Sequence, residues 1–384
     1  MAVKKKIYLD YNATTPTDPR VVEAMLPYFT EKFGNASSDH FFGWDANEAV
    51  ENSREQIARL INCKPNGITF TSGATEAANL ALFGFCQVYQ SKGKHIISCK
   101  TEHKAILDTL KALENDGFVV TYLDVDSDGN IDLQELENSI TSETILVCLM
   151  LANNETGLIH PMHGIEKIVH PKGVKLMSDI TQAVGKLPVD LKALNLDIAI
   201  FSSHKIYGPK GVGALYINKK NEIEIEPQVF GGGQEKGIRP GTLNVPGIVG
   251  FGKAAEIAFS EMDEEAIRIA KLRDQLEGLL MESGACKINS RAAERLPNTT
   301  NISFENIDGN QLLRKLNSLA VSRGSACTSN TTEPSHALKA MGLSDEQALS
   351  SLRISLGRNT NLSDIEFAAE EIRNIVNQLK RAVV

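Results

Sequence analysis

Short β-rich segments alternate with helical stretches over the first two-thirds of the chain, and this alternation constrains the fold more than any other feature. Such alternation predicts an α/β fold with a mainly parallel sheet and helices on both of its faces. Apolar residues at helical spacing also predict a helix over residues 45–61. The β-rich segments, each bounded by turn residues, are expected at residues 68–70, 95–98, 118–123, 144–151, 174–177 and 197–202.

The pattern changes after about residue 260, where a long charged helical stretch spans residues 261–282. Short strands are expected around Lys287 and Thr300, with helices over residues 310–317 and 335–341. Capping patterns at Ser344–Gln347 and Ser363–Glu366 predict the starts of two more helices. A chain of 384 residues has room for a large and a smaller domain. We therefore expect a large domain over residues 15–258 and a smaller α+β C-terminal domain over residues 259–384 joined by residues 1–14.

Composition excludes several classes of protein. Lys plus Arg number 40 and Asp plus Glu 48, so the net charge of −8 argues against a nucleic-acid binder. The longest apolar run, residues 145–152, is far too short for a membrane span, and no apolar segment follows the N-terminal lysines as a secretory signal requires. We expect a cytoplasmic protein that binds neither nucleic acid nor membrane.

Six cysteines are scattered at positions 63, 86, 99, 148, 286 and 327. No two of them form a CxxC pattern, so the sequence predicts neither a disulfide framework nor a structural zinc site. Scattered thiols fit a reducing compartment.

Two patterns in the sequence suggest metal binding, but the residues around each of them argue against a metal site. Residues 124–135 match the calcium-loop pattern of an EF-hand, but a strand precedes them where an EF-hand needs a helix. We expect an Asp–Gly turn between a strand and a helix, with Asp132 near the helix start; a calcium-binding protein without catalysis is the alternative. His160, His163 and His170 have no cysteine or carboxylate at ligand spacing, so we expect surface or packing histidines and no metal site.

Four segments after predicted strands carry the chemistry, because ligands of such sheets bind beyond the carboxyl ends of the strands. Residues 72–76 form a small-residue turn that opens a helix, which suits an anion. Asp179 follows a strand directly and suits either a cationic ring nitrogen or a helix cap. Lys205 ends a Ser-Ser-His-Lys segment after another strand, a setting that suits Schiff-base chemistry beside a phosphate.

The fourth segment, the glycine-rich residues 231–242, fits a loop that approaches a phosphate and an ordinary surface loop about equally well. Each of the four signals is modest alone. A lysine for a Schiff base, an aspartate for a pyridinium nitrogen and donors for a phosphate are together what pyridoxal phosphate requires.

With these residues together, the sequence resembles the cysteine desulfurases of the class V aminotransferase group, which are fold-type I pyridoxal-phosphate enzymes. The resemblance covers nearly the whole chain. The motifs that carry it lie at residues 8–15, 34–38, 72–76, 101–105, 153–157, 179–182, 202–205, 239–242, 323–329 and 355–358.

The resemblance implies a role for each matching residue. Lys205 would carry the cofactor and move protons, and His103 would stack on its ring and assist acid–base steps. Asp179 would keep the ring nitrogen protonated, Gln182 would hydrogen-bond the phenolic oxygen, and Asn154 would contact cofactor and substrate. The phosphate would be held by Ala74, Thr75, Ser202 and His204.

Two further roles concern the partner subunit and the substrate. Thr242 would reach the phosphate of a partner subunit, which implies a homodimer. Arg353 would bind the substrate carboxylate through its bidentate guanidinium. On the residues alone, a helix cap is the alternative for His103 and a surface salt bridge is the alternative for Arg353.

Cys327 stands among small and polar residues, which predicts an exposed loop where a thiolate can attack sulfur. The other five cysteines are expected to be packing residues. The resemblance implies conversion of L-cysteine to L-alanine with a persulfide on Cys327, whose sulfur passes to an acceptor such as an iron–sulfur scaffold protein; selenocysteine lyase or another class V activity is the alternative. Phe230, Pro240 and a short tail after Arg373 depart from the family pattern and leave the acceptor open.

Overall fold

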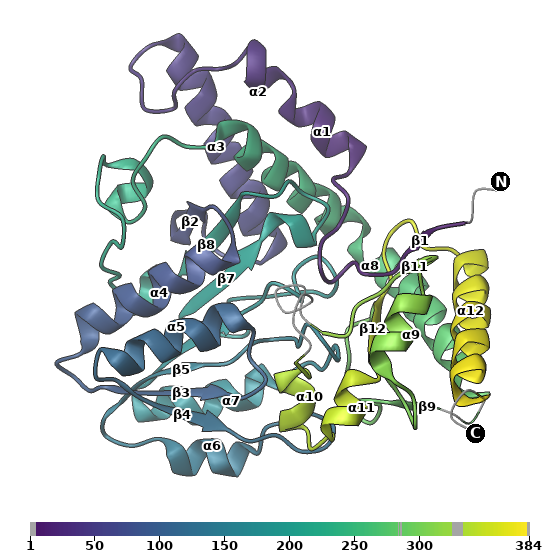
Figure 1. The fold of residues 1–384 in the computed structure, drawn as a ribbon. Helices are drawn as coiled ribbons and strands as arrows, with labels where there is room; N and C mark the ends of the chain where they lie inside the picture. The colour runs from purple at the N-terminus through teal and green to yellow at the C-terminus, as the bar shows by residue number, and fades with distance from the viewer. Residues whose placement is uncertain (1–4, 283, 285, 325–332, 382–384) are drawn as a thin grey trace.

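The computed structural model describes residues 5–282, 284, 286–324 and 333–381. Its centre is a seven-stranded sheet in the order β2-β8-β7-β6-β5-β3-β4 (Figure 1). All neighbouring strands are parallel except β8, which is antiparallel to β2 and β7. The predicted α/β class with a mainly parallel sheet is confirmed. The strands are β2 (Ile68–Thr71), β3 (His95–Cys99), β4 (Val119–Leu123), β5 (Thr144–Cys148), β6 (Lys175–Asp179), β7 (Ile198–Ser202) and β8 (Gly213–Ile217).

Every strand expected for the large sheet is present, but two details differ from the prediction. β5 ends at Cys148 rather than at residue 151, although the amides of Leu149 and Leu151 still donate to β6 carbonyls at 3.1 and 2.9 Å. β8 was not predicted. All five of its residues are buried because it lies between two other strands and under helices, so it lacks the polar alternation that marks a half-exposed strand.

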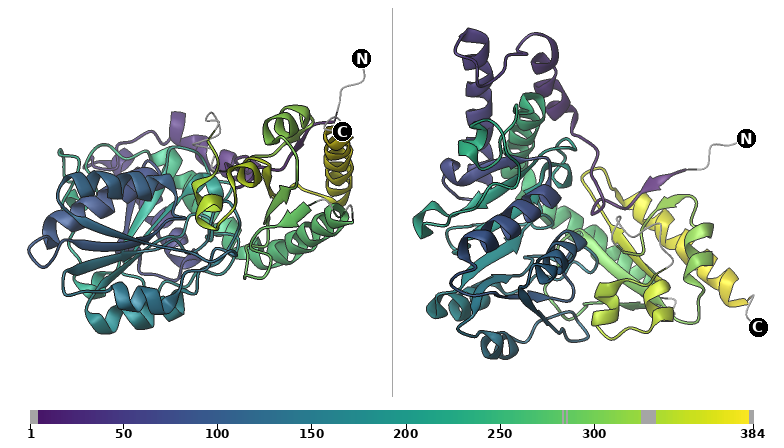
Figure 2. Two further views of the ribbon diagram at one scale, coloured as in Figure 1. Left: turned by 60° about the horizontal axis from the view of Figure 1, so that its bottom comes forward. Right: turned by 60° about the vertical axis from the view of Figure 1, so that its left-hand side comes forward.

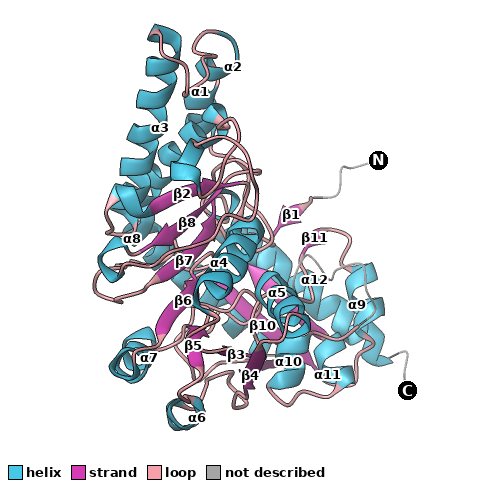
Figure 3. Ribbon diagram, turned by 90° about the vertical axis from the view of Figure 1, so that its left-hand side faces the viewer, coloured by secondary structure: helices cyan, strands magenta, loops and turns pink. Residues whose placement is uncertain are grey.

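Helices cover both faces of the sheet, and the strand residues alternate between two hydrophobic clusters (Figure 3). Leu146 and Cys148 of β5 pack in the cluster that contains α4 and α5, whereas Val147 packs in the cluster that contains α3, α7 and α8. This alternation is the two-residue period of a strand. The helices here are α1 (Pro19–Met25), α2 (Pro27–Thr30), α3 (Phe41–Leu60), α4 (Ala74–Tyr89), α5 (Lys104–Asn115), α6 (Leu133–Ser139) and α7 (Met162–Val169).

Helix α8 (Val245–Met281) is a single helix of 37 residues and is much longer than the stretch 261–282 that was predicted. Its first half buries Phe251 against Phe201 in the core of the large sheet. Its second half buries Leu276 and Leu280 in a separate core. The expected domain boundary at residues 258–259 falls inside this helix, and the division into two domains stays a prediction.

The second core lies beside the first and is built on the antiparallel sheet β12-β10-β9 (Figure 2). The short strands β1 and β11 pair in parallel nearby, so the N-terminal segment joins this part of the chain. The elements are β1 (Ile7–Tyr8), β9 (Cys286–Ile288), β10 (Thr299–Phe304), β11 (Leu319–Ala320), β12 (Ser351–Ser355), α9 (Gly309–Lys315), α10 (His336–Ala340), α11 (Asp345–Leu349) and α12 (Leu362–Arg381).

One of the two predicted capping boxes is present and the other is wrong. Ser344 caps α11 and Gln347 returns the reciprocal bond. Ser363 lies inside α12, because Asn361 accepts from the Asp364 amide at 3.2 Å and donates its own amide to the Asp364 carboxylate. The helix therefore begins two residues earlier than the Ser–Glu pattern indicates. None of the described helices is both long and apolar enough to cross a membrane.

The loop that resembles an EF-hand connects strand β4 to helix α6, as predicted. Asp132 is the N-cap of α6 and accepts from the Gln134 amide at 2.8 Å. The Asp126 carboxylate is occupied by its own turn, where it accepts from the amides of Asp128 and Asn130 at 2.9 Å each. Within the described ranges, no group of three or more His, Cys, Asp or Glu side chains is placed to hold a metal ion.

Candidate active site

A cavity of about 510 Å³ lies at the carboxyl ends of β6 and β7, where α4 begins and β12 of the second core approaches. This volume is in the range of a cofactor or small-molecule site. Arg353 enters from β12, so the cavity lies where the two cores meet. The residues of the resemblance that line it are Ala74, Thr75, His103, Asn154, Asp179, Gln182, Ser202, His204, Lys205 and Arg353.

One end of the cavity is formed by the N-terminus of α4, where Gly73 is the N-cap and no side chain caps the helix. Free backbone amides at a helix start suit an anion. The backbones are close here, because a Cβ on Gly213 would lie 2.6 Å from the Gly73 Cα. Ser202 and His204 border the same end. Burial, together with nearby lysines, lowers the pKa of His204 to about 4, so its ring is neutral at pH 7.

Lys205 ends the short turn that follows β7. Its Nζ donates to the carbonyl oxygens of Asn12 and Ala13 at 2.6 and 2.7 Å. The N-terminal segment thus lies against Lys205, and these two hydrogen bonds fix the position of its amine.

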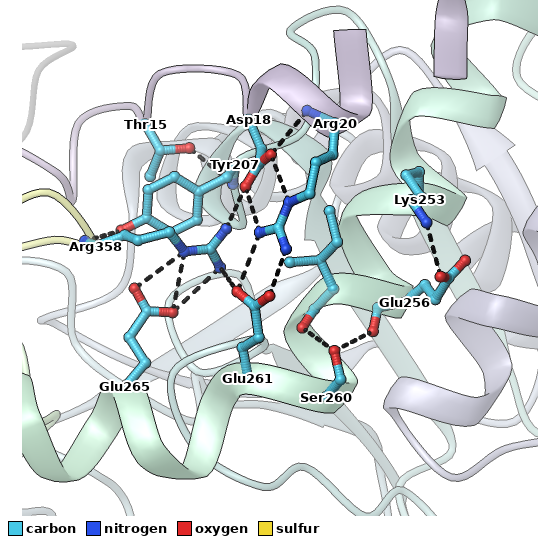
Figure 4. A network of polar contacts seen from close by, with 11 residues as sticks. Thr15, Asp18, Arg20, Tyr207, Lys253, Glu256, Ser260, Glu261, Glu265 and Arg358 are labelled. Carbon is cyan, nitrogen blue, oxygen red and sulfur yellow. Dashed lines mark hydrogen bonds and ion pairs between the residues drawn. The ribbon is translucent and has the colours of Figure 1, made fainter. Parts of the chain in front are cut away.

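The turn after Lys205 is braced by a polar network that reaches α1, α8 and the chain beyond β12 (Figure 4). Thr15 donates to the His204 carbonyl at 2.9 Å and accepts from the Tyr207 amide at 2.8 Å. The hydroxyl of Tyr207 accepts from the Arg358 amide at 2.6 Å. Tyr207 has a φ of 65°, a strained value for a non-glycine residue, and these bonds hold it there.

Arg358 anchors this network. Its guanidinium contacts the carboxylates of Asp18 at 2.6 Å and Glu265 at 3.2 Å. A hydrogen bond from Arg20, with Arg358 nearby, lowers the pKa of Asp18 to about 2. These charges are paired at neutral pH, and they tie the chain after β12 to α1 and α8.

Asp179 and His103 each combine a capping contact with a place in the cavity. Asp179 is 7% exposed at the end of β6 and accepts from the Thr181 amide at 2.9 Å. His103 is the N-cap of α5, where its Nδ1 accepts from the Ala105 amide at 3.1 Å. The proton of a neutral His103 ring therefore sits on Nε2. The helix-cap alternative was correct for His103, whereas Asp179 caps a turn, because the described chain has no helix between β6 and β7; both side chains also line the cavity.

Arg353 is 1% exposed, so the alternative of a surface salt bridge is wrong. Its guanidinium donates to the Asn154 carbonyl at 3.1 Å and to the Asp10 carboxylate at 2.7 Å. Its Nε has no hydrogen-bond partner among the described residues. A buried, unpartnered donor on a cation that lines a cavity suits a bound carboxylate.

Two predicted site residues are not among the described residues that line this cavity. Thr242 is exposed on the glycine-rich loop, away from the cavity lining of its own chain. Cys327 lies outside the described residues. The chain just after that segment contacts the cavity loops, because Ser335 donates to the Glu155 carboxylate and His336 bonds the Glu102 carbonyl at 2.9 Å.

The glycine-rich loop that carries Thr242 is anchored at two points. Glu235 accepts from Arg54 at 2.8 Å and from the Phe70 amide at 2.8 Å, and its side chain is almost fully buried. Arg239 donates at 2.7 Å to Glu76, which lies in the first turn of α4. The loop is therefore tied to the end of the cavity where α4 begins, rather than being an ordinary surface loop.

Several residues in or beside the cavity were not given a role from the sequence. Asn12 lines the cavity and belongs to a motif that carries the resemblance, and that motif was the only signal available. Glu102 precedes His103, and burial raises the pKa of its carboxyl well above the usual value. Lys186 follows Gln182 by four residues and donates to its side-chain oxygen.

The other five cysteines are packing residues to different degrees. Cys63, Cys86, Cys99 and Cys148 are buried, as predicted, and Cys286 is half-buried. Burial raises the pKa of the Cys63 and Cys86 thiols to about 12, which leaves them as poor nucleophiles.

Comparison with known proteins places the chain in a family. The model of the aminotransferase class-V family matches residues 7–367. A cysteine desulfurase IscS from Anaeromyxobacter dehalogenans is 49% identical over 380 residues, covering 98% of this chain and 94% of that protein. One from Neisseria meningitidis serogroup C is 48% identical over 381 residues, covering 99% and 94%.

Solved structures agree. A NifS-like protein superimposes with a TM-score of 0.91 at 40% identity, covering 97% of this chain and all of that one. SspA in complex with cysteine gives a TM-score of 0.81 at 35% identity, covering 92% and 99%. The chain belongs to the aminotransferase class-V family. The membership predicted from the motifs is confirmed.

The three histidines allow a prediction about stability. His170 bonds Asp197 at 2.9 Å and His163 is exposed, whereas His160 is 2% exposed and neither ring nitrogen has a partner among the described residues. Burial lowers the pKa of His160 to about 4, from an ordinary 6.5. Between pH 6.5 and about pH 4, His160 therefore binds a proton in the unfolded chain but not in the folded one. The free energy of unfolding falls as the pH drops through this range.

The wild type loses stability between pH 7 and pH 5, and we expect His160→Leu to lose about 2 kcal/mol less over the same range. Urea unfolding at both pH values measures this, with His163→Leu as the exposed control. An equal loss in the wild type and His160→Leu would contradict it.

Proposed function

We propose that the protein is a pyridoxal-phosphate-dependent cysteine desulfurase that removes sulfur from L-cysteine and releases L-alanine. The observation that carries this proposal is the presence of Lys205 and the buried Arg353, with its unpartnered Nε, in one cavity. The first can hold an aldehyde cofactor and the second can hold the carboxylate of an amino acid. The names of the relatives supply the reaction.

The donor set of the cavity fits pyridoxal phosphate. Lys205 would bind the cofactor covalently, Asp179 would hold the ring nitrogen and Gln182 the phenolic oxygen. The bound cofactor supplies an electron sink that lets bonds at the α- and β-carbons of the substrate break. The phosphate would be held at the start of α4 by Ala74, Thr75, Ser202 and His204.

The remaining steps belong to side chains of the protein. Arg353 orients the substrate by its carboxylate, and Lys205 Nζ moves the α-proton. His103 would stack on the cofactor ring and exchange protons at Nε2. Cys327 supplies a thiolate that attacks the substrate sulfur, so an S–S bond forms while the substrate C–S bond breaks, and protons complete alanine.

The sulfur held on Cys327 passes to an acceptor, and we propose an iron–sulfur scaffold protein for this role. A persulfide-forming thiol must start reduced, which supports a cytoplasmic location. Thr242 is exposed on an anchored loop next to the exposed apolar side chains Val229 and Phe230. This arrangement supports a homodimer in which Thr242 reaches the phosphate of the partner.

Replacement of the sulfur-accepting cysteine tests the proposal most directly. Cys327→Ala should abolish persulfide and sulfide formation from L-cysteine, because no thiolate remains to take the sulfur, while the visible absorption of bound cofactor persists. Cys286→Ala, which removes the half-buried thiol at the start of β9, should keep full turnover. Unchanged turnover in Cys327→Ala would refute the role of this residue.

Replacement of the buried arginine should weaken substrate binding. Arg353→Lys keeps the charge and loses the planar fork, so the KM for L-cysteine should rise roughly 10–100-fold, in line with the loss of a charge-assisted hydrogen bond. Steady-state kinetics measure this, with Arg373→Lys on α12, which pairs with Glu282, as the control outside the cavity. A KM that stays at the wild-type value would contradict the carboxylate role.

The homodimer has a simple physical readout. Light scattering should give a mass of twice 41.9 kDa. Thr242→Ala should release cofactor several-fold faster on dialysis without a change in mass, since one phosphate hydrogen bond is lost. A monomeric mass would contradict the dimer, and unaltered cofactor retention would contradict the contact across it.

A further inference from the structure

The amine of Lys186 lies between two buried amides that line the cavity, those of Gln182 and Asn12. Its Nζ donates to the Gln182 Oε1 and, at 3.3 Å, to the Asn12 Oδ1. Gln182 is 5% exposed and Asn12 is 1% exposed. A protonated lysine amine has only donors, so it requires an oxygen from each amide.

The opposite ends of both amides are thereby fixed as donors. Gln182 Nε2 points to the Asn12 carbonyl at 3.0 Å, the same oxygen that accepts from Lys205. Asn12 Nδ2 donates to the Asn154 carbonyl at 3.2 Å and to the Thr299 hydroxyl at 2.9 Å. Because an amide nitrogen has two hydrogens, Gln182 keeps a second one for a group in the cavity.

The surroundings of Lys186 disfavour a positive charge on its amine. Burial, with the like charges of Lys205 and Arg353, lowers the pKa of its amine well below the ordinary value. A neutral amine keeps two N–H donors, one for each amide oxygen, and the amide nitrogens of Gln182 and Asn12 still face carbonyl oxygens, so the same orientation satisfies all of these groups after deprotonation. Tyr11, Tyr207 and Glu265 line a small hollow beside Lys186, and Glu265 is paired with Arg358.

We infer that Lys186 is a positioning residue for the cofactor, which locks the Gln182 amide so that Nε2 and not Oε1 faces the phenolic oxygen of pyridoxal phosphate. An ionised phenolic oxygen needs a donor, and a flipped amide would place two oxygens against each other. This inference rests on the proposed function. The inference goes beyond the proposed function because it names the residue that decides which atom of Gln182 faces the cofactor, and this residue does not itself touch the cofactor.

The test compares resting holoenzymes without substrate. Lys186→Met keeps the apolar stem and removes the donor, so its visible cofactor band should shift in the same direction as that of Gln182→Leu. Cofactor retention on dialysis should weaken about tenfold in both, as for the loss of one buried hydrogen bond. The double variant should be no worse than Gln182→Leu alone, because Lys186 acts through Gln182.

The controls separate the possible failures. Lys175→Met removes a lysine that pairs with Asp197 at the far end of β6 and should leave the band unchanged. Lys186→Ala replaces the Met variant if that variant does not fold, and should show the same shift. A wild-type band in both donor-free variants, or additive losses in the double variant, would overturn the inference. A wild-type protein with no visible band would instead refute the proposed function.

Discussion

The hydrogen bonds of Asn12 are the constraint on which the site depends. This residue is 1% exposed, and it bonds Lys205 and Gln182 of the large sheet region. Its amide also donates to the Ser355 hydroxyl at 2.9 Å, and its side chain reaches Thr299. A buried polar group left without a partner costs about 1–3 kcal/mol. The two cores and the candidate cofactor lysine therefore have to stay in one relative arrangement for these bonds to form together.

Much of the fold followed from local pattern, and the errors have a common cause. Six strands and the placement of Asp179 and Lys205 after them could be predicted, because a strand's period and its turn residues are local. Strand β8 and the first half of α8 could not, since they are buried on nearly all sides and show little polar alternation. The burial of Arg353 likewise depends on contacts with residues far away in the sequence.

The site residues show that capping and ligand binding are compatible roles. His103 and Asp179 satisfy backbone amides at the start of a helix or turn, and these bonds fix the side chains that line the cavity. A cap thus serves as a support that limits rotation of the ring or carboxylate. From the sequence alone the two roles were alternatives, because a sequence does not show which atoms of a side chain already form hydrogen bonds. No feature of the sequence indicated a role for Lys186 for the same reason, since the proposed role depends on its hydrogen bonds to the side-chain amides of Gln182 and Asn12.

Helix α8 sets a limit on how the site can open. Its 37 residues form a rod about 55 Å long that is built into both hydrophobic cores. A hinge between the cores would have to break backbone hydrogen bonds in the middle of this rod or bend it sharply. Substrate entry and product exit must therefore rely on local displacement of loops, while the angle between the cores stays nearly constant through turnover.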